Sequence, residues 1–184
     1  LFMTTLLHIC CAPCSICAID TLRAEGIEVT GFWFNPNIHP TTEYRARKNA
    51  LVGYAQSISL PLIAWGDYGL RAFLSGIPAF DDRCGYCYQT RLEQTATYAR
   101  ENGFDSFSTT LLISPYQNHA LLRETGEKMA ARYGVEFLYR DFRPRFREGQ
   151  DKARALELYM QKYCGCLFSE EERYQKKPRK EVRA

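Results

Sequence analysis

Short apolar stretches alternate with longer amphipathic stretches along the chain, and this alternation limits the folds that the chain can adopt. The apolar stretches are typical of strands and cover residues 4–9, 28–35, 60–66, 105–114 and 135–142. Helical spacing of apolar residues predicts helices over residues 15–26, 41–58, 87–102, 119–134 and 149–163. Alternating strands and helices form a parallel sheet with helices on both faces. The sequence therefore predicts an α/β domain over residues 1–170, followed by a basic tail over residues 171–184.

The size and composition fit one globular domain in a reducing compartment. The chain has 184 residues, of which 46% are apolar and 14% aromatic, so it can bury a substantial core. No apolar run is long enough to span a membrane, and the apolar N-terminal stretch lacks the basic flank of a signal peptide. We therefore expect a cytoplasmic protein without a membrane partner. In such a compartment, the eight cysteines favour metal binding or catalysis over structural disulfides.

The cysteines form three groups, and one of them follows the first predicted strand. The stretch HICCAPCSIC holds Cys10, Cys11, Cys14 and Cys17. In a parallel sheet, ligands bind beyond the carboxyl ends of the strands, which is where this group begins. The other two groups are the C-x-x-C pair Cys84 and Cys87 and the C-x-C pair Cys164 and Cys166. Thiolates bind soft metal ions, and close spacing lets one turn of backbone supply two ligands, so the three groups predict a metal or cluster site.

The adjacent cysteines Cys10 and Cys11 favour an iron–sulfur cluster over a structural zinc ion. Successive side chains of an extended chain point to opposite faces. Either the backbone leaves extended geometry at Cys10, or the two sulfurs serve different centres. A cluster presents several irons over a wider surface, and we expect it to accept neighbouring ligands more readily than one zinc ion does.

Two further patterns leave alternatives open. Cys10, Cys14 and Cys17 have the C-x-x-x-C-x-x-C spacing of radical S-adenosylmethionine enzymes, although the chain is short for their barrel. Cys17 falls inside the first predicted helix, where we expect a buried thiol, whereas Cys14 lies close enough to reach the site. Cys164 and Cys166, separated by one glycine, either bind metal or form a strained, easily reduced disulfide.

Taken together, the motifs resemble the QueH type of epoxyqueuosine reductase over nearly the whole chain. The resemblance rests on HICCAPC, FNPNIHPTTEY, RCGYCYQTRL, TTLLISPYQNH, DFRPRFREG and KYCGC, in the order of the family. It implies a HUP-like α/β domain with a [4Fe–4S] cluster. It also implies the reductive removal of the epoxide oxygen from epoxyqueuosine at the wobble position of a tRNA anticodon.

The resemblance also implies roles for particular residues. Cys10, Cys11, Cys84 and Cys87 would hold the cluster, and Cys164 with Cys166 would form a redox-active pair. Cys14 would be either an additional ligand, for instance to a second, mononuclear iron, or a bystander. Removal of the oxygen as water requires an electron donor, which the sequence does not identify, and a proton donor. Tyr86 and His39 are the favoured proton donors.

A tRNA substrate directs attention to the basic C-terminal quarter of the chain. Arg143, Arg145 and Arg147 alternate with aromatic residues at the predicted functional edge, a pattern suited to phosphate contact and base stacking. We expect this arginine segment, more than the tail, to bind the RNA. Two other functions remain in competition: a radical S-adenosylmethionine enzyme, and a zinc-stapled RNA-binding module without redox chemistry.

Overall fold

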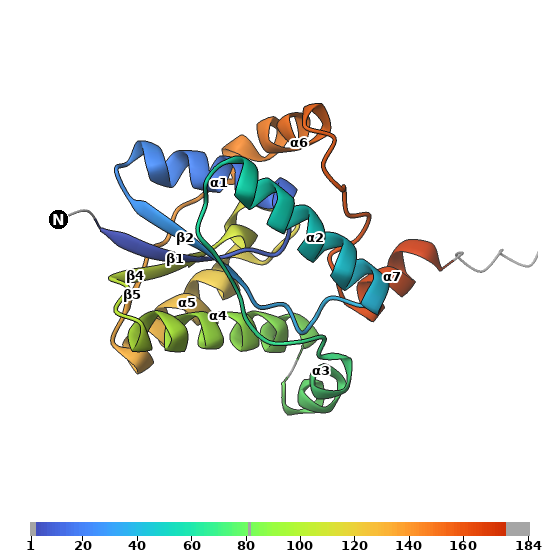
Figure 1. The fold of residues 1–184 in the computed structure, drawn as a ribbon. Coiled ribbons are helices and arrows are strands. Elements are labelled where there is room, and N and C mark those ends of the chain that lie inside the picture. The colour runs from blue at the N-terminus through green and yellow to red at the C-terminus, as the bar shows by residue number, and fades with distance from the viewer. Residues whose placement is uncertain (1–2, 81, 176–184) are drawn as a thin grey trace, which may run out of the picture.

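The computed structural model describes residues 3–80 and 82–175 and contains a five-stranded parallel sheet (Figure 1). The strands are β1 (Thr4–His8), β2 (Glu28–Trp33), β3 (Leu62–Ala64), β4 (Ser106–Thr109) and β5 (Glu136–Phe137). Their order in the sheet is β3-β2-β1-β4-β5, and every neighbouring pair is parallel. The predicted α/β fold with a parallel sheet is confirmed.

Helices cover both faces of the sheet. Seven α-helices are present in the described residues: α1 (Ala12–Ala24), α2 (Thr41–Ser57), α3 (Leu70–Gly76), α4 (Arg83–Glu101), α5 (His119–Tyr133), α6 (Phe146–Ala155) and α7 (Leu167–Tyr174). Figure 1 shows α1, α2 and α6 on one face and α4 and α5 on the other. The short helices α3 and α7 lie beyond the carboxyl ends of the strands (Figure 1).

The central strand β1 explains the apolar run near the N-terminus. Its neighbours are β2 on one side and β4 on the other, and Leu6 and Leu7 are fully buried. A strand covered on both faces needs apolar residues at successive positions rather than at alternate ones. The chain extends the sheet from β1 toward β3 and then adds β4 on the opposite side of β1. The carboxyl ends of β1 and β4 therefore meet at the topological switch point, where open α/β sheets bind ligands.

Several predicted elements have different bounds in the structure. The predicted strand over 105–114 ends at Thr109, because the Thr109 hydroxyl accepts a hydrogen bond from Leu111 N–H and starts a 3-10 helix, Thr110–Ile113. Helix α4 begins at Arg83 rather than at residue 87, because the Asp82 carboxylate accepts the free N–H groups of its first turn. Helix α3 was not predicted.

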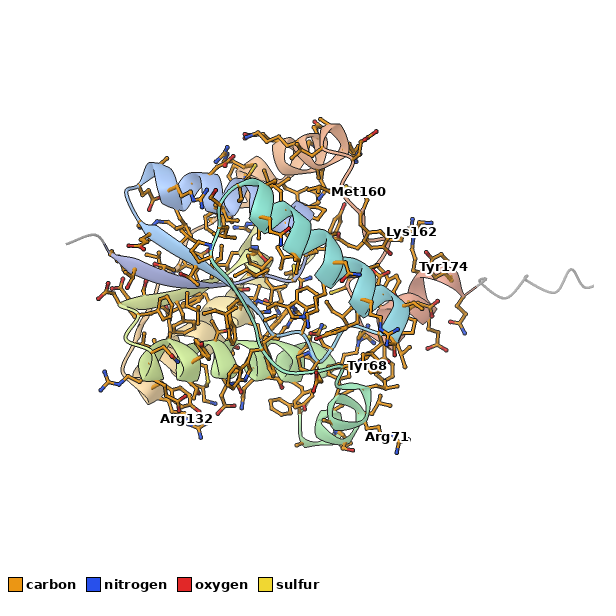
Figure 2. The ribbon with its side chains drawn as sticks, in the orientation of Figure 1. Tyr68, Arg71, Arg132, Met160, Lys162 and Tyr174 are labelled. Carbon is orange, nitrogen blue, oxygen red and sulfur yellow. The ribbon has the colours of Figure 1, made fainter. Side chains whose placement is uncertain are left out.

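The predicted helix over residues 149–163 is wrong in its second half. Helix α6 starts at Phe146 and stops at Ala155, and Glu157 has a left-handed backbone with φ of 53°. No residue between 156 and 166 is helical. We call residues 156–166 the strap, because this segment joins α6 to α7. Figure 2 shows Met160 and Lys162 on the strap, at the end of the molecule opposite the amino-terminal ends of the strands.

The division at residue 170 remains a prediction. Helix α7 continues across it to Tyr174, and residues 176–184 of the predicted tail lie outside the described residues, as do residues 1, 2 and 81. Within the described parts of the chain, no helix combines the length and apolarity that a membrane crossing requires.

Candidate functional site

Three cysteine side chains converge where β1 gives way to α1. The Sγ atoms of Cys10, Cys11 and Cys14 all lie within 4.8 Å of one another, and all three residues are buried. Cys10 Sγ and Cys11 Sγ are 3.8 Å apart. Strand β1 ends at His8 and the chain bends at Cys10, so the alternation of an extended strand does not separate the two sulfurs. Within residues 3–80 and 82–175, this thiol triad is the only such cluster of three or more metal-ligand side chains.

Thr110 fixes the position of Cys10 from the neighbouring strand. Its hydroxyl oxygen accepts a hydrogen bond from the Cys10 backbone N–H at 3.2 Å and lies 3.5 Å from Cys10 Sγ. Thr110 directly follows β4, and Cys10 follows β1, so the contact joins the two strands at the switch point. Nearby, His8 is fully buried and bonds Thr109 Oγ1 at 2.9 Å and Asn35 Oδ1 at 3.1 Å. His8 is thus a core histidine whose two ring nitrogens are both hydrogen-bonded.

The three thiols of the triad differ in acidity. Hydrogen bonds from Cys11, Cys14 and Thr110 hold the pKa of Cys10 well below its usual range. Burial raises the pKa of Cys11, and the hydrogen bond to Cys10 raises that of Cys14. Sulfur binds metals as the thiolate, and a metal ion in turn favours loss of further protons. A buried, all-sulfur donor set of this kind fits a thiophilic metal centre.

The second helical cysteine, Cys17, does not join the triad. It is fully buried in α1, and its sulfur faces Gly149 of α6. The spacing typical of radical S-adenosylmethionine enzymes is therefore not assembled into one ligand set here. Cys17 behaves as the small buried residue that the sequence predicted.

The C-x-x-C and C-x-C pairs meet through Cys87 and Cys166, and neither Cys84 nor Cys87 belongs to the thiol triad. Cys84 and Cys87 lie in the first two turns of α4, where Cys84 is exposed and Cys87 is buried. Cys87 and Cys166 belong to one small apolar cluster with Phe73, whereas Cys164 is exposed. Burial raises the pKa of Cys87 to about 12.

A buried arginine lies against Cys87. Arg91, one turn further along α4, is 2% exposed and donates from Nη2 to Cys87 Sγ at 2.9 Å and from Nε to the Cys87 carbonyl at 3.1 Å. Within the described residues, no carboxylate forms an ion pair with Arg91. A buried charge needs a partner, and sulfur is the partner that the structure supplies.

A second buried arginine holds the strap in place. Arg47 of α2 is 1% exposed and pairs through Nε with Glu43 at 2.6 Å. Its two remaining nitrogens donate to the carbonyls of Tyr163 and Cys164 at 2.9 and 2.8 Å. His39 adds a third attachment, because its backbone N–H donates to the Gly165 carbonyl at 2.8 Å. These bonds place the C-x-C pair at the carboxyl edge of the sheet.

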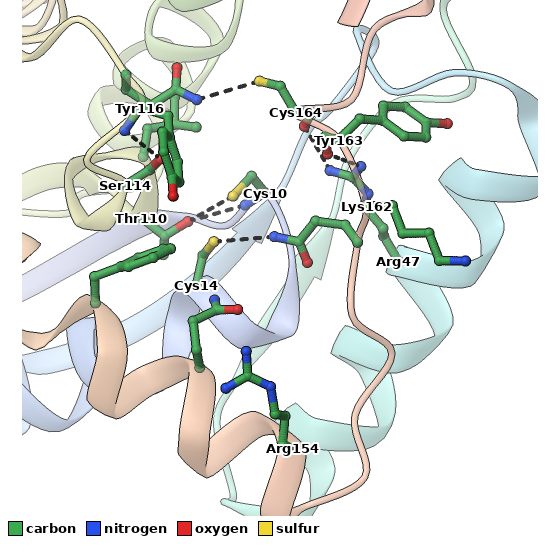
Figure 3. A pocket seen from close by; sticks show the side chains of 15 residues that line it. Cys10, Cys14, Arg47, Thr110, Ser114, Tyr116, Arg154, Lys162, Tyr163 and Cys164 are labelled. Carbon is green, nitrogen blue, oxygen red and sulfur yellow. Dashed lines mark hydrogen bonds between the residues drawn. The ribbon is translucent and has the colours of Figure 1, made fainter. Parts of the chain in front are cut away.

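A cavity of about 450 Å³ opens above the triad (Figure 3). Cys10 and Cys14 form part of its wall on one side, and Cys164 of the strap lines the other. Gln117 donates to Cys164 Sγ at 3.4 Å, and Gln161 donates to Cys14 Sγ at 3.5 Å. The cavity thus brings sulfur from two of the three cysteine groups to one space.

The remaining predicted residues do not line this cavity. The Tyr86 ring packs against Phe73 and Phe80, with its hydroxyl 3.4 Å from the Ala72 carbonyl. His39 is buried, its Nε2 lies 2.9 Å from the Pro36 carbonyl, and burial lowers its pKa. As proton donors, both therefore remain predictions that the cavity geometry does not support.

The predicted RNA-binding arginines also lie outside the cavity lining. Arg143 pairs with Asp141 at 2.7 Å, and Arg145 pairs with Glu148 at 2.6 Å and donates to Thr21 of α1. Carboxylates thus neutralise two of the three. Arg147 is exposed, and within the described residues it forms no ion pair.

Sequence reasoning missed Thr110, Arg47 and Arg91. Arg91 follows Cys87 by four residues, so helical spacing could have placed the two on one face. Arg47 follows Glu43 by four residues, which is the usual signal of an exposed helical ion pair rather than of a buried anchor. Thr110 carries no local signal, because only the pairing of β1 with β4 brings it to Cys10.

The fold and the site define a class: an α/β protein with a buried thiol centre at the switch point of its sheet. The family model for "Epoxyqueuosine reductase QueH" matches residues 5–172, and the chain belongs to this family. It is 38% identical over 172 residues to the protein of that name from Dehalococcoides mccartyi, covering 93% of this chain and 94% of the relative. It is 36% identical over 184 residues to the one from Thermotoga maritima, covering 94% and 93%.

A solved structure shows the same fold at much lower sequence identity. It is a predicted subunit of a tRNA methyltransferase from Methanocaldococcus jannaschii, with a TM-score of 0.55 and 10% identity, covering 82% of this chain and 75% of that one. This likeness concerns the fold alone.

Proposed function

We propose that this protein is an oxidoreductase that converts epoxyqueuosine in tRNA to queuosine. The observation that carries the proposal is the buried thiol triad, two of whose cysteines, Cys10 and Cys14, line a cavity large enough for a nucleoside. Membership of the reductase family supplies the substrate and the reaction. The reaction breaks both C–O bonds of the epoxide and forms a carbon–carbon double bond. Two electrons and two protons are consumed, and the oxygen leaves as water.

The sulfur groups would provide the redox chemistry. We infer that Cys10, Cys11, Cys84 and Cys87 hold a [4Fe–4S] cluster, which supplies electrons one at a time when it is bound. Cys14, within 4.8 Å of Cys10 and Cys11, is available to a second, mononuclear iron. The electrons would come from an external donor in a reducing, cytoplasmic setting.

The C-x-C pair offers a second source of electrons. Oxidation of Cys164 and Cys166 to a disulfide releases two electrons and two protons, which balances the removal of one epoxide oxygen as water. Cys164 lines the cavity, and Gln117 donates a hydrogen bond to its sulfur. Thr110 would hold the thiol of Cys10 in place and Gln161 that of Cys14, because each donates a hydrogen bond to that sulfur.

The decisive experiment compares two buried cysteines of α1. Cys14→Ala removes a triad thiol, whereas Cys17→Ala removes an equally buried thiol outside the triad, so the pair separates ligation from packing. We expect anaerobically purified wild type and Cys17→Ala to bind iron, to absorb in the visible range and to convert epoxyqueuosine-containing tRNA, as followed by mass analysis of the released nucleosides. We expect Cys14→Ala to keep the iron of the cluster, to lose the iron bound in excess of it and to lose at least tenfold in activity.

The outcome also separates the competing functions. A colourless wild type that binds zinc even when iron is supplied, and leaves the tRNA unchanged, would contradict the reductase and favour a zinc-stapled RNA-binding module. Loss of iron from Cys17→Ala but not from Cys14→Ala would contradict the triad as a metal centre.

A further inference from the structure

The charge of the cavity lining identifies what kind of molecule its rim accepts. Among the described residues that line it, none is acidic, and three are cations: Arg47, Arg154 and Lys162. The guanidinium of Arg47 is already bonded to Glu43 and to two strap carbonyls. Arg154 and Lys162 are therefore the cations of the lining that can contact a ligand. A cavity edge with cations and no carboxylate favours a polyanion such as an RNA backbone.

The aromatic side chain of Tyr116 lies at the rim of the cavity and is largely exposed to solvent. Tyr116 lies in the loop between the 3-10 helix Thr110–Ile113 and α5, and it is 85% exposed. Its ring meets Phe146 of α6 edge-on, with the centroids 6.0 Å apart, and its backbone N–H donates to the Ser114 hydroxyl at 3.3 Å. A tyrosine ring with an open face loses little conformational entropy when a flat ligand stacks on it, because its side chain has few rotatable bonds.

Arg154 completes a two-part surface with Tyr116. Its side chain reaches from α6 toward the cavity, across from Tyr116 (Figure 3). Arg154 pairs with Asp151 at 2.8 Å, but the two side chains are 62% and 76% exposed, so this pair contributes little and can be exchanged for a phosphate. Lys162, on the strap, adds a second cation to the rim, with no ion pair in residues 3–80 and 82–175.

We propose that the cavity rim binds the anticodon loop of the substrate tRNA, with Tyr116 as the stacking platform for a base that flanks the modified nucleoside and Arg154 as a phosphate contact. The proposal rests on the proposed function for the identity of the RNA. It places the main RNA contact at the rim rather than at Arg143 and Arg145, which do not line the cavity. Unstacked loop bases on aromatic rings are the usual mode of single-stranded RNA recognition.

Binding measurements on an anticodon stem–loop RNA test the platform without relying on turnover. The probe carries the fluorescent base 2-aminopurine beside the wobble position, where stacking on a tyrosine quenches emission. We expect wild type and Tyr116→Phe to bind and quench alike. Tyr116→Leu should bind about 5- to 100-fold more weakly and lose the quenching.

The charge contact has its own matched control. Arg132 of α5 is 59% exposed and pairs with a carboxylate as Arg154 does, but it lies at the opposite end of the molecule from the strap (Figure 2). We expect Arg154→Gln to reduce the slope of log Kd against log salt by about one. Arg132→Gln should leave the slope unchanged.

The result that overturns the platform differs from the result that overturns the reductase. Equal affinity and quenching for Tyr116→Leu and wild type, in protein that still converts epoxyqueuosine-containing tRNA, would reject the rim as the contact and keep the proposed function. Wild type that does not convert that tRNA would reject the proposed function itself.

Discussion

At the scale of single residues, Arg91 imposes the strongest constraint, because a buried guanidinium has to be balanced by a negative charge. Its side-chain donors meet the sulfur and carbonyl of Cys87, and no described carboxylate pairs with it. A cluster held by thiolates carries net negative charge and would supply the balance. We therefore expect Arg91 to position Cys87 and to balance its charge when a cluster is bound.

Removal of that charge should lower the reduction potential of the bound centre. A nearby cation stabilises the more negative, reduced state, so we expect Arg91→Met to shift the potential downward by at least 59 mV, a tenfold change for a one-electron couple. Arg91→Lys keeps the charge and should shift it less. The measurement is an anaerobic spectroelectrochemical titration, with the exposed Arg132→Met as the control. An unchanged potential in iron-loaded Arg91→Met would contradict this role.

The sequence predicted the cysteines of the site but not its buried arginines. Cys10 and Cys14 were found from spacing, because sulfur at the end of a buried strand has few structural uses. The two sulfurs of Cys10 and Cys11 come together because the backbone bends at Cys10, and no neighbouring residue type predicts this bend. Arg47 and Arg91 were missed because charged residues in helices are ordinarily exposed, and only their distant partners make burial favourable.

At the scale of elements, the strap depends on Arg47 more than on its own sequence. The strap has no helix and no strand, and Arg47 bonds two of its carbonyls. Arg47→Met should free the strap and leave Glu43 buried without its ion-pair partner, at a cost of about 3 kcal/mol in the free energy of unfolding. Hydrogen exchange followed by mass spectrometry should show faster exchange in the strap, residues 156–166, and unchanged exchange in β1.

A double variant separates the two effects of Arg47. In Arg47→Met/Glu43→Gln, the unpaired buried carboxylate is gone, so we expect part of the lost stability to return. Exchange in the strap should stay fast, because the carbonyl bonds remain absent. Slow exchange in the strap of either variant would show that other contacts, such as the His39 bond to Gly165, hold it.

The strap also shows why helix boundaries were harder to predict than helices. Residues 149–163 contain good helix formers and neither glycine nor proline after Gly149, so their spacing continues a helical pattern. The chain leaves the helix at Leu156 and Glu157, and its path is set by Arg47 and His39, which lie more than a hundred residues earlier. Tertiary contacts overrode local propensity there. The central strand β1 and the long helix α2 were predicted well, because their patterns serve local packing.

At the scale of the whole molecule, the three histidines act together on acid stability. Burial lowers the pKa of His8 to about 4 and also lowers the pKa values of His39 and His119. Between these lowered values and the ordinary 6.5, the unfolded chain binds protons that the folded chain rejects. Stability therefore falls as the pH drops below about 6.5. The carboxylates of Asp141 and Glu148, whose pKa values lie near 2, lose their contribution only at still lower pH.

His39 provides the test of this acid response, because it can be changed away from the thiol triad. His39→Gln keeps a side-chain donor for the Pro36 carbonyl but cannot be protonated in this range, so its free energy of unfolding should fall less steeply between pH 7 and pH 5 than that of wild type. A single titrating group changes the slope by at most about 1.4 kcal/mol per pH unit. Urea denaturation at several pH values measures the difference. Equal slopes for the two proteins would show that His39 binds its proton as readily in the folded chain as in the unfolded one, and the fall in stability would then belong to His8 and His119.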